Sequence, residues 1–444
     1  MILQFVKTNI LSKKLKNFLT IFAIMISVML IICIQNISAQ LSTNVIDNIS
    51  IYDIIVGKNG SSTGLVLNTV FYYGVPEGNI DISYLDKLKS NKYVKKAVPI
   101  GMGDSFHGYK LIGTSPEYFQ FDEDEKEVYT LKEGRFIQDE FEVVLGSTVA
   151  KKTGLKVGDT FKSQHGLGGA AEAEEGEEHH HDTDYKVVGI LNPTNTPNDT
   201  VLFTTIESIW HVHGLHDEDH DHEHEDEDHD HEEGEDHEHE EEHEEETTKN
   251  ALSHGVSSND EEEESTKLLT AVLVRTRGLS ELNLLYQDLQ RDDNVQGIMP
   301  TSTLRELLNT FNIAEIVVTL IAGVSVVLSV IMLFITMLTS SIETRKDISI
   351  LRALGASRKV VFNINVVEML IIAAIGIVLG FIMAHIVIGI LGGYVVETYG
   401  LNISGTIFQT EEFVVIGITL LLSLIAGIVP AMMVYKTDAT KYLK

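Results

Sequence analysis

The chain has 444 residues, which is enough for two or three domains. It carries 65 Asp and Glu against 33 Lys and Arg, for a net charge of −32, and this acidic balance argues against nucleic acid as a partner. The single cysteine, Cys33, lies in an apolar run, which excludes an intrachain disulfide and a cluster of thiolate metal ligands.

Four segments are apolar and long enough to cross a bilayer as helices. They cover residues 18–35, 313–339, 360–391 and 413–435. Lys and Arg gather in three short flanking segments, residues 1–17, 340–359 and 436–444. The loop 392–412 instead contains three Glu and no base. Because basic loops stay in the cytoplasm, we expect a membrane protein with both termini inside and residues 36–312 outside.

The first apolar segment has an alternative interpretation as a cleaved signal peptide, or as a lipoprotein signal that ends at Cys33. However, the bulky Ile32 stands directly before Cys33, where a lipid-attachment site needs a small residue. An apolar core of 17 residues is also long for a signal. Removal of this segment would leave three spans and an odd topology, so the sequence favours a retained first helix.

The region between the first two spans predicts an α+β domain. Strand-like stretches alternate with helical patterns, the strands at 95–100, 109–113, 142–145 and 268–276 and the helices at 82–92 and 280–290. Two low-complexity insertions, residues 166–184 and 211–264, interrupt this pattern and are predicted to be disordered without metal. The fold class is therefore an integral membrane protein with four transmembrane helices, one before and three after a large extracytoplasmic domain.

The insertions hold most of the histidines, with 15 of 18 between His179 and His254. Residues 216–246 contain nine His, 21 acids and one Gly, so this run has nothing apolar to bury. It is either an acidic tether or a binder of divalent metal, since imidazole and carboxylate are ligands for Zn²⁺, Ni²⁺ and Cu²⁺. We expect no tightly bound cofactor but several exchanging metal sites. The candidate ligands are His179, His180, His181, His211, His213, His216, His220, His222, His224, His229, His231, His237, His239 and His243.

The part of the sequence that is predicted to fold shows no catalytic pattern of the Ser-His-Asp, Cys-His or paired-carboxylate type. Asp104, His107 and His165 occur singly and far apart along the chain, so we do not expect them to form a site. The chain also lacks the G-x-x-x-x-G-K-[ST] phosphate loop. We therefore expect that it is not an enzyme, and that any ATP hydrolysis belongs to a separate polypeptide.

Three ionisable residues fall within the apolar spans, where such groups are usually functional. Glu315 and Glu368 lie near span ends, close to the headgroups, and we expect structural roles for both. His385 lies deeper in the third span. No line of polar residues crosses all four spans, which argues against a hydrophilic pore for a metal ion.

The segment from Ser341 to Arg358 carries a specific pattern. Its sequence, SIETRKDISILRALGASR, resembles the E-x-R-x-E-I-x-x-L-R-A-L-G-A-x-x-R segment of ABC transporter permeases of the MacB/FtsX type, with Asp347 in place of Glu. Residues 15–20 are similar to the family's entry to span one. The C-terminal end, from Pro430 to Ala439, resembles the family's closing P-A…D-P pattern, with Ala439 in place of the second Pro.

This resemblance implies a permease subunit of the bacterial inner membrane that forms a homodimer. It also implies that the subunit works with a separate cytoplasmic ABC ATPase. The amphipathic segment would then be the coupling helix that docks onto the ATPase. By composition alone, it would be only a helix held at the membrane lipid by its charge. The residues expected to couple are Glu343, Arg345, Leu351, Arg352, Leu354, Gly355 and Arg358.

Residues 51–80 resemble a narrower subgroup of these permeases with members in zinc-responsive transport operons. The leading hypothesis is therefore a permease linked to divalent metal handling, with an extracytoplasmic metal-binding or adaptor protein as a further partner. One alternative is a MacB-like exporter of peptides, drugs or lipoproteins whose His-rich loop is incidental. The other is an FtsX-like transmitter that activates an envelope hydrolase without transport.

Overall fold

The computed structural model describes residues 2–120, 129–166, 180–213 and 267–435. Predictions that concern the remaining residues, including the His-rich run at 216–246, lie outside this described part. The chain divides into a helical unit, Met1–Asp47 with Arg305–Lys444, and an α+β unit, Asn48–Leu304.

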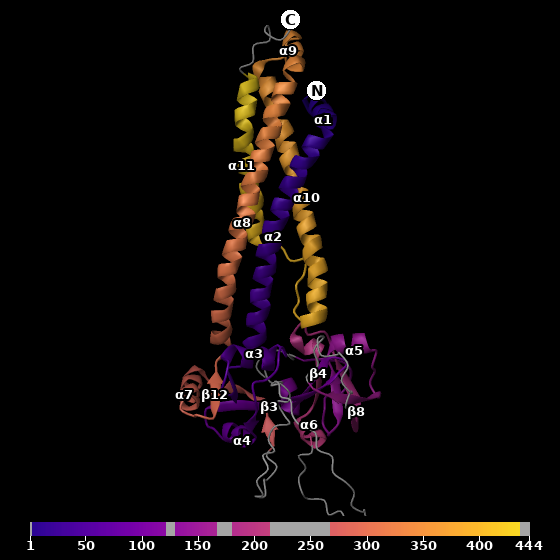
Figure 1. Cartoon of the computed structure of the whole chain (residues 1–444), viewed down its shortest axis with the longest axis vertical. Helices are drawn as coiled ribbons and strands as arrows, with labels where there is room; N and C mark the ends of the chain where they lie inside the picture. The colour runs from indigo at the N-terminus through magenta and orange to yellow at the C-terminus, as the bar shows by residue number, and fades with distance from the viewer. Residues whose placement is uncertain (1, 121–128, 167–179, 214–266, 436–444) are drawn as a thin grey trace, which may run out of the picture. The chain divides into compact units, whose positions relative to one another are not determined.

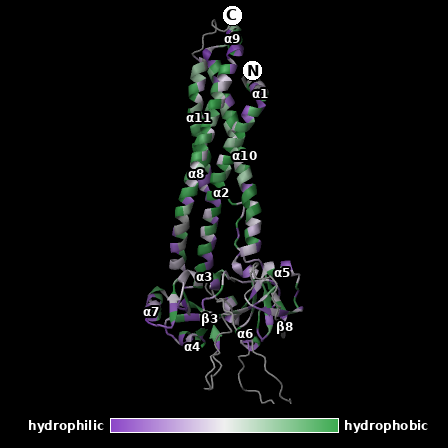
Figure 2. Ribbon diagram, viewed as in Figure 1, coloured by the Kyte–Doolittle hydropathy of each residue, from purple (hydrophilic) through white to green (hydrophobic). Residues whose placement is uncertain are grey.

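The helices of the helical unit account for the four predicted spans. The described elements are α1 (Ile2–Ser12), α2 (Lys14–Ile49), α8 (Pro300–Glu343), α9 (Arg345–Ala353), α10 (Arg358–Tyr399) and α11 (Thr410–Tyr435) (Figure 1). Of these, α2, α8, α10 and α11 are long and apolar enough to cross a membrane, which confirms the prediction of four transmembrane helices. Figure 2 shows hydrophobic residues along most of their length.

The helices extend beyond the spans that hydropathy predicts. The predicted outer loop at 392–412 is wrong at its start, because α10 continues to Tyr399 and ends at Gly400 in the left-handed conformation, with a φ of 69°. The 42 residues of α10 correspond to about 63 Å of helix, roughly twice the thickness of the hydrocarbon core. Its outer end therefore does not depend on contact with lipid, and hydropathy cannot locate it.

Small residues let α2 and α10 pack closely. A Cβ atom at Gly380 would lie 2.7 Å from the backbone oxygen of Met25, and one at Gly376 would lie 2.8 Å from the Cβ of Ile24. Within a membrane, helix association depends on such van der Waals packing and on hydrogen bonds between helices. The buried hydroxyls of Thr20 and Thr336, 2.8 Å apart, provide one of these bonds between α2 and α8.

The α+β unit is built on a ten-stranded mixed sheet with the order β12-β1-β11-β3-β4-β9-β6-β8-β5, in which β7 pairs with β3 and β8. The strands are β1 (Ile54–Lys58), β3 (Val94–Phe106), β4 (Tyr109–Thr114), β5 (Leu131–Gly134), β6 (Glu142–Leu145), β7 (Thr160–His165), β8 (His180–Leu191), β9 (Leu202–Thr205), β11 (Ala271–Thr276) and β12 (Val295–Ile298). Two short strands, β2 (Ile80–Asp81) and β10 (Leu268–Leu269), form a second sheet.

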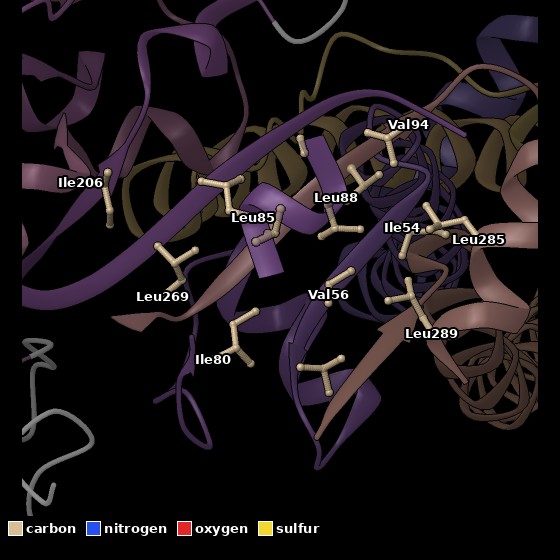
Figure 3. Close-up of a cluster of buried hydrophobic side chains, with 14 of the residues drawn as sticks. Ile54, Val56, Ile80, Leu85, Leu88, Val94, Ile206, Leu269, Leu285 and Leu289 are labelled. Carbon is tan, nitrogen blue, oxygen red and sulfur yellow. The ribbon is translucent and has the colours of Figure 1, made fainter. Parts of the chain in front are cut away.

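Five helices complete the α+β unit: α3 (Ser62–Val70), α4 (Ser83–Lys89), α5 (Ser147–Thr153), α6 (Ile206–Val212) and α7 (Leu279–Leu289). One buried core joins β1 and β11 to α4 and α7 (Figure 3). Its side chains follow the period of each element: Ile54 and Val56 alternate along β1, whereas Leu85 and Leu88 are three residues apart on α4. The predicted α+β class is therefore confirmed.

The structure corrects the boundaries of both predicted insertions. β8 begins at His180, so the end of the insertion placed at 166–184 belongs to a strand. This strand pairs antiparallel with β7, and the backbone pairing outweighs the polar composition of its first residues. The second insertion was placed at 211–264, but His211 lies in α6. The described residues extend to His213 and start again at Lys267.

Candidate functional site

The predicted coupling segment folds as the separate helix α9 between α8 and α10. Two backbone hydrogen bonds close its C-terminal end, from Gly355 N to Arg352 O at 3.1 Å and from Ala356 N to Leu351 O at 3.0 Å. This is the Schellman arrangement, in which the residue after the cap takes a positive φ. Gly355 has a φ of 101°, which explains why glycine stands there. Ser357 then caps α10 by accepting a hydrogen bond from Val360 N.

Contacts with neighbouring helices hold this segment in place. Glu343, at the end of α8, forms an ion pair with Lys16 and lies 3.9 Å from the Nζ of Lys13. At the other end, the Arg358 guanidinium lies 6.0 Å from the centre of the Tyr435 ring. Glu343 and Arg358 therefore have structural partners within the helical unit, while Arg345 and Arg352 are partly exposed.

The apolar residues of α9 point in two directions. Ile348 is buried, and Leu351 lines a small cavity together with Asn9 and Glu368. On the other side, Ile350 is 50% exposed and Leu354 is 82% exposed. A helix that leaves large apolar side chains exposed on a cytoplasmic segment offers a surface on which a partner can dock.

A second site lies in the α+β unit, where three elements bring together Asp104, His165 and His213. Asp104 and His165 are cross-strand partners on β3 and β7. His213 directly follows α6, and its N–H donates to Ile209 O at 3.3 Å. The Trp210 Nε1 donates to Leu268 O at 2.8 Å, which fixes the end of this helix. One ligand atom from each residue lies within 4.8 Å of the others, so the three residues could hold one metal ion. We call these three residues the metal cluster.

The distances within the metal cluster fit a small divalent cation. His213 Nε2 lies 3.3 Å from Asp104 Oδ1, and His165 Nδ1 lies 3.9 Å from the same oxygen. In a tetrahedral zinc site with bonds of about 2.1 Å, neighbouring ligand atoms are about 3.4 Å apart. Movements of less than about 1 Å would therefore give bonding geometry.

Burial of Asp104 makes a negative charge on its carboxylate unfavourable unless a cation lies nearby. The Asp104 side chain is fully buried, whereas the side chains of His213 and His165 are 13% and 35% exposed. Ser163 Oγ donates to Asp104 Oδ2 at 3.4 Å. Burial raises the pKa of the neighbouring Tyr185, and the negative charge of Asp104 raises it further. A buried carboxylate is stabilised by a cation, and the two imidazoles at the exposed side could serve as additional ligands for one.

The metal cluster lies where the two His-rich insertions leave the described fold. His165 is followed by one described residue before the gap at 167–179, and His213 is the last described residue before the gap at 214–266. Their ring centroids are 5.1 Å apart. The roots of the two insertions, far apart along the chain, therefore lie side by side.

The other predicted metal ligands are placed differently. His211 does not join the metal cluster, because its Nδ1 lies 3.5 Å from Glu140 and its ring packs on Phe141. His180 and His181 lie on β8, with the His180 backbone opposite Gln164. The following candidates lie outside the described residues: His179, His216, His220, His222, His224, His229, His231, His237, His239 and His243.

Asp104 and His165 were not expected to form a site, yet they are neighbours in the structure. Pairing of β3 with β7 brings them together despite their separation along the chain. His107 remains apart, in the turn between β3 and β4, where it and Gly108 have φ values of 49° and 80°. The one available sequence signal is position: His165 directly precedes one insertion, and His213 lies at the start of the other.

Comparison with known proteins identifies the chain at the level of its family. Residues 17–222 match the model of the MacB-like periplasmic core domain, and residues 319–439 match that of the FtsX-like permease C-terminal region. The fold and these matches define an ABC transporter permease, a multi-pass inner-membrane protein. It belongs to the MacB/FtsX type, whose members work with a cytoplasmic ABC ATPase.

No curated protein sequence matches the chain. Among solved structures, the periplasmic region of MacB from Actinobacillus actinomycetemcomitans is 11% identical, with a TM-score of 0.32, covering 60% of this chain and 97% of that one. The extracellular domain of the noncanonic ABC-type transporter YknZ from Gram-positive bacteria is 12% identical, with a TM-score of 0.29, covering 55% and 98%. Similarities this low add nothing to the assignment by family.

Proposed function

We propose that this permease couples a separate cytoplasmic ATPase to the handling of divalent metal, of the zinc class, outside the membrane. The observation that carries the proposal is the metal cluster of Asp104, His165 and His213 at the roots of the His-rich insertions. A tether needs no such cluster in the folded domain. The position suggests that ions held on the insertions exchange with a defined site in the fold.

The donor set suits this role. Two imidazole nitrogens and one carboxylate oxygen form a three-ligand site for Zn²⁺, with the fourth tetrahedral position open to water or to another ligand. A histidine from either insertion can occupy that position and hand over an ion. Ni²⁺ and Cu²⁺ accept the same donors, so the ligands define the class of metal and leave selection among these ions to availability.

The second part of the proposal, coupling to the ATPase, rests on the cytoplasmic helix α9. Ile350 and Leu354 present exposed apolar surface on α9, which is anchored by the contacts of Glu343 and Arg358 described above. An ATPase that binds this surface can move α9 together with the ends of α8 and α10. The chain itself would then transmit the motion, with no ATP chemistry of its own.

Zinc titration of the full-length chain in lipid nanodiscs tests the metal site. In a chain whose residues 216–246 are replaced by a Gly/Ser linker, we expect the metal cluster to be the tightest remaining Zn²⁺ site. His165→Ala and Asp104→Asn should each weaken it by at least about 10-fold, because each removes a ligand. His165 is the more exposed of the two, so its variant should not disturb folding.

His211→Ala is the matched control, because His211 lies two residues from His213 but contacts Glu140 instead. It should leave the affinity of the linker-containing chain unchanged. Equal Zn²⁺ binding by the His165→Ala, Asp104→Asn and His211→Ala chains would show that the metal cluster holds no ion, and the proposal would fail.

A further inference from the structure

A second group of ionisable residues lies within the helical unit, away from α9. His385 on α10 and Glu412 in the first turn of α11 form a buried pair, with 3.1 Å between His385 Nε2 and Glu412 Oε2. The Glu412 side chain is fully buried and that of His385 is 10% exposed. Neither the proposed coupling to the ATPase nor the proposed binding of metal uses this pair.

The hydrogen bonds of His385 determine how many protons the pair holds. Its Nδ1 lies 2.8 Å from the carbonyl oxygen of Gly405, which can only accept, so Nδ1 carries a hydrogen. The contact between Nε2 and the carboxylate also needs a hydrogen between them, whichever group carries it. The pair therefore holds one proton more than a neutral imidazole beside a carboxylate.

This proton supports a larger polar network. Glu412 Oε1 accepts hydrogen bonds from the Asn36 side chain on α2 and from Gln409 N at 3.2 Å. Asn36 Nδ2 also donates to Ile407 O at 2.9 Å. On the next turn of α2, Gln40 Nε2 donates to Ser404 O at 3.0 Å, and Gln40 Oε1 accepts from Ser404 N at 2.8 Å.

The network fixes the segment 400–409 that connects α10 and α11. This segment runs back along α10, since a Cβ at Gly405 would lie 2.3 Å from the carbonyl oxygen of His385. The rings of Phe381 and Phe408 each have centroids 4.7 Å from that of His385.

We propose that His385 and Glu412 form a proton-binding site whose bound proton holds segment 400–409 against α2 and α10. Loss of the proton would leave the lone pair of Nε2 facing a carboxylate, so the contact would become repulsive and the segment would be released. The ligand of this site is thus H⁺, and the site is independent of metal binding.

The charged groups around the pair do not supply an alternative counter-ion. On α2, the residues that face the pair are the amides Asn36 and Gln40, and the segment 400–409 contains no ionisable side chain. Glu411, the neighbour on α11, is exposed. On α8, Glu315 accepts a hydrogen bond from Ser38, and Glu397 lies 12 residues beyond His385 on α10.

Amide hydrogen exchange of the full-length chain in nanodiscs tests this site. The protection of peptides covering 401–407 should be measured between about pH 5 and pH 9 and corrected for intrinsic exchange with an unstructured peptide of the same sequence. We expect protection to be high at low pH and to fall as pH rises. Because one proton is released, the fall should approach but not exceed tenfold per pH unit.

Glu412→Gln separates proton binding from simple packing. The amide of Gln can donate to Nε2 of neutral His385 and still accept from Asn36, so protection should remain high and lose its dependence on pH. Glu411→Gln, one residue away and exposed, should behave as the original chain. Corrected protection that is equal at both ends of the pH range in the original chain would overturn the proposal, whether or not the variants fold. So would an unchanged pH dependence in Glu412→Gln.

Discussion

Lys110 shows how burial of a single charge shapes the stability of the α+β unit. Its Nζ donates a hydrogen bond to the carbonyl oxygen of Gly74, and burial lowers the pKa of this amine from 10.5 to about 8. Between these pH values the unfolded chain binds more protons at Lys110 than the folded chain does. Stability therefore rises with pH across this window, and below it the buried charge costs up to about 3 kcal/mol.

We predict that Lys110→Met raises the thermal unfolding temperature of the α+β unit at pH 7, because it removes the buried charge. It should also abolish the gain in stability between pH 8 and pH 10.5 that the lowered pKa produces. Differential scanning calorimetry of the full-length chain in detergent measures both effects, with the exposed Lys132→Met as control. A lower unfolding temperature at pH 7 would show that the bond to Gly74 outweighs the cost of burial.

Single site residues were only partly predictable from the sequence. The composition of the insertions indicates metal ligands, and His213 is among the residues that it selects. Asp104 and His165 carry no comparable signal, because each lies in a strand outside the His-rich insertions. They become ligand candidates only through the β3–β7 register, which depends on packing of the whole sheet.

At the scale of elements, α9 combines an internal and an external apolar side on one short helix. Leu351 lines the cavity beside Glu368, whereas Leu354 is exposed at the end of the helix. Amphipathic spacing alone predicts one apolar face and cannot separate these two roles. The turn after the helix orients Leu354, since Gly355 adopts the positive φ that closes the Schellman motif.

We predict that Leu354→Asp disrupts binding of the partner ATPase, because it places a charge on the exposed apolar surface, while membrane insertion is unaffected. Copurification of the ATPase with the tagged permease measures the effect, and a loss of at least about 10-fold is expected, which corresponds to about 1.4 kcal/mol. Leu354→Met keeps the surface apolar and should bind normally. If both variants retain the ATPase equally, Leu354 does not lie in the docking surface.

Other elements show where sequence patterns are sufficient. The transmembrane helices follow from hydropathy because a bilayer leaves the backbone no other way to satisfy its hydrogen bonds within one segment. By contrast, β5 has four residues, Leu131–Gly134, with mostly exposed side chains and no apolar alternation. Its pairing with β8 supplies the strand, so no local pattern could predict it.

For the whole molecule, charge distribution and hydropathy predict the division into a helical and an α+β unit. The order of strands in the sheet was not predictable in the same way. β4 and β9 pair in parallel, with Leu111 opposite Leu202, although four strands, β5 to β8, separate them in sequence. Such long-range pairs depend on the final packing of both faces, and local sequence carries little information about them.

Residues of the folded domain hold together the two ends of the larger insertion. Trp210 at one end is hydrogen-bonded to Leu268 at the other, with 2.8 Å between Nε1 and the carbonyl oxygen, and the Lys267 ammonium lies 5.4 Å from the centre of the Trp210 ring. The run 216–246 has no apolar side chain to add to the core. Its ends are therefore held by residues outside the run.

We predict that replacing residues 216–246 with a short Gly/Ser linker leaves expression, membrane insertion and ATPase stimulation unchanged, because the Trp210–Leu268 contact keeps the base closed. The dependence of growth on external zinc, measured under limitation and under excess, should be reduced, since the chain loses nine candidate ligands. A run of equal length and charge with every His replaced by Gln is the matched control and should behave like the linker. If it behaves like the original chain, the run serves as an acidic tether, and the link between this permease and metal rests on the cluster of Asp104, His165 and His213 alone.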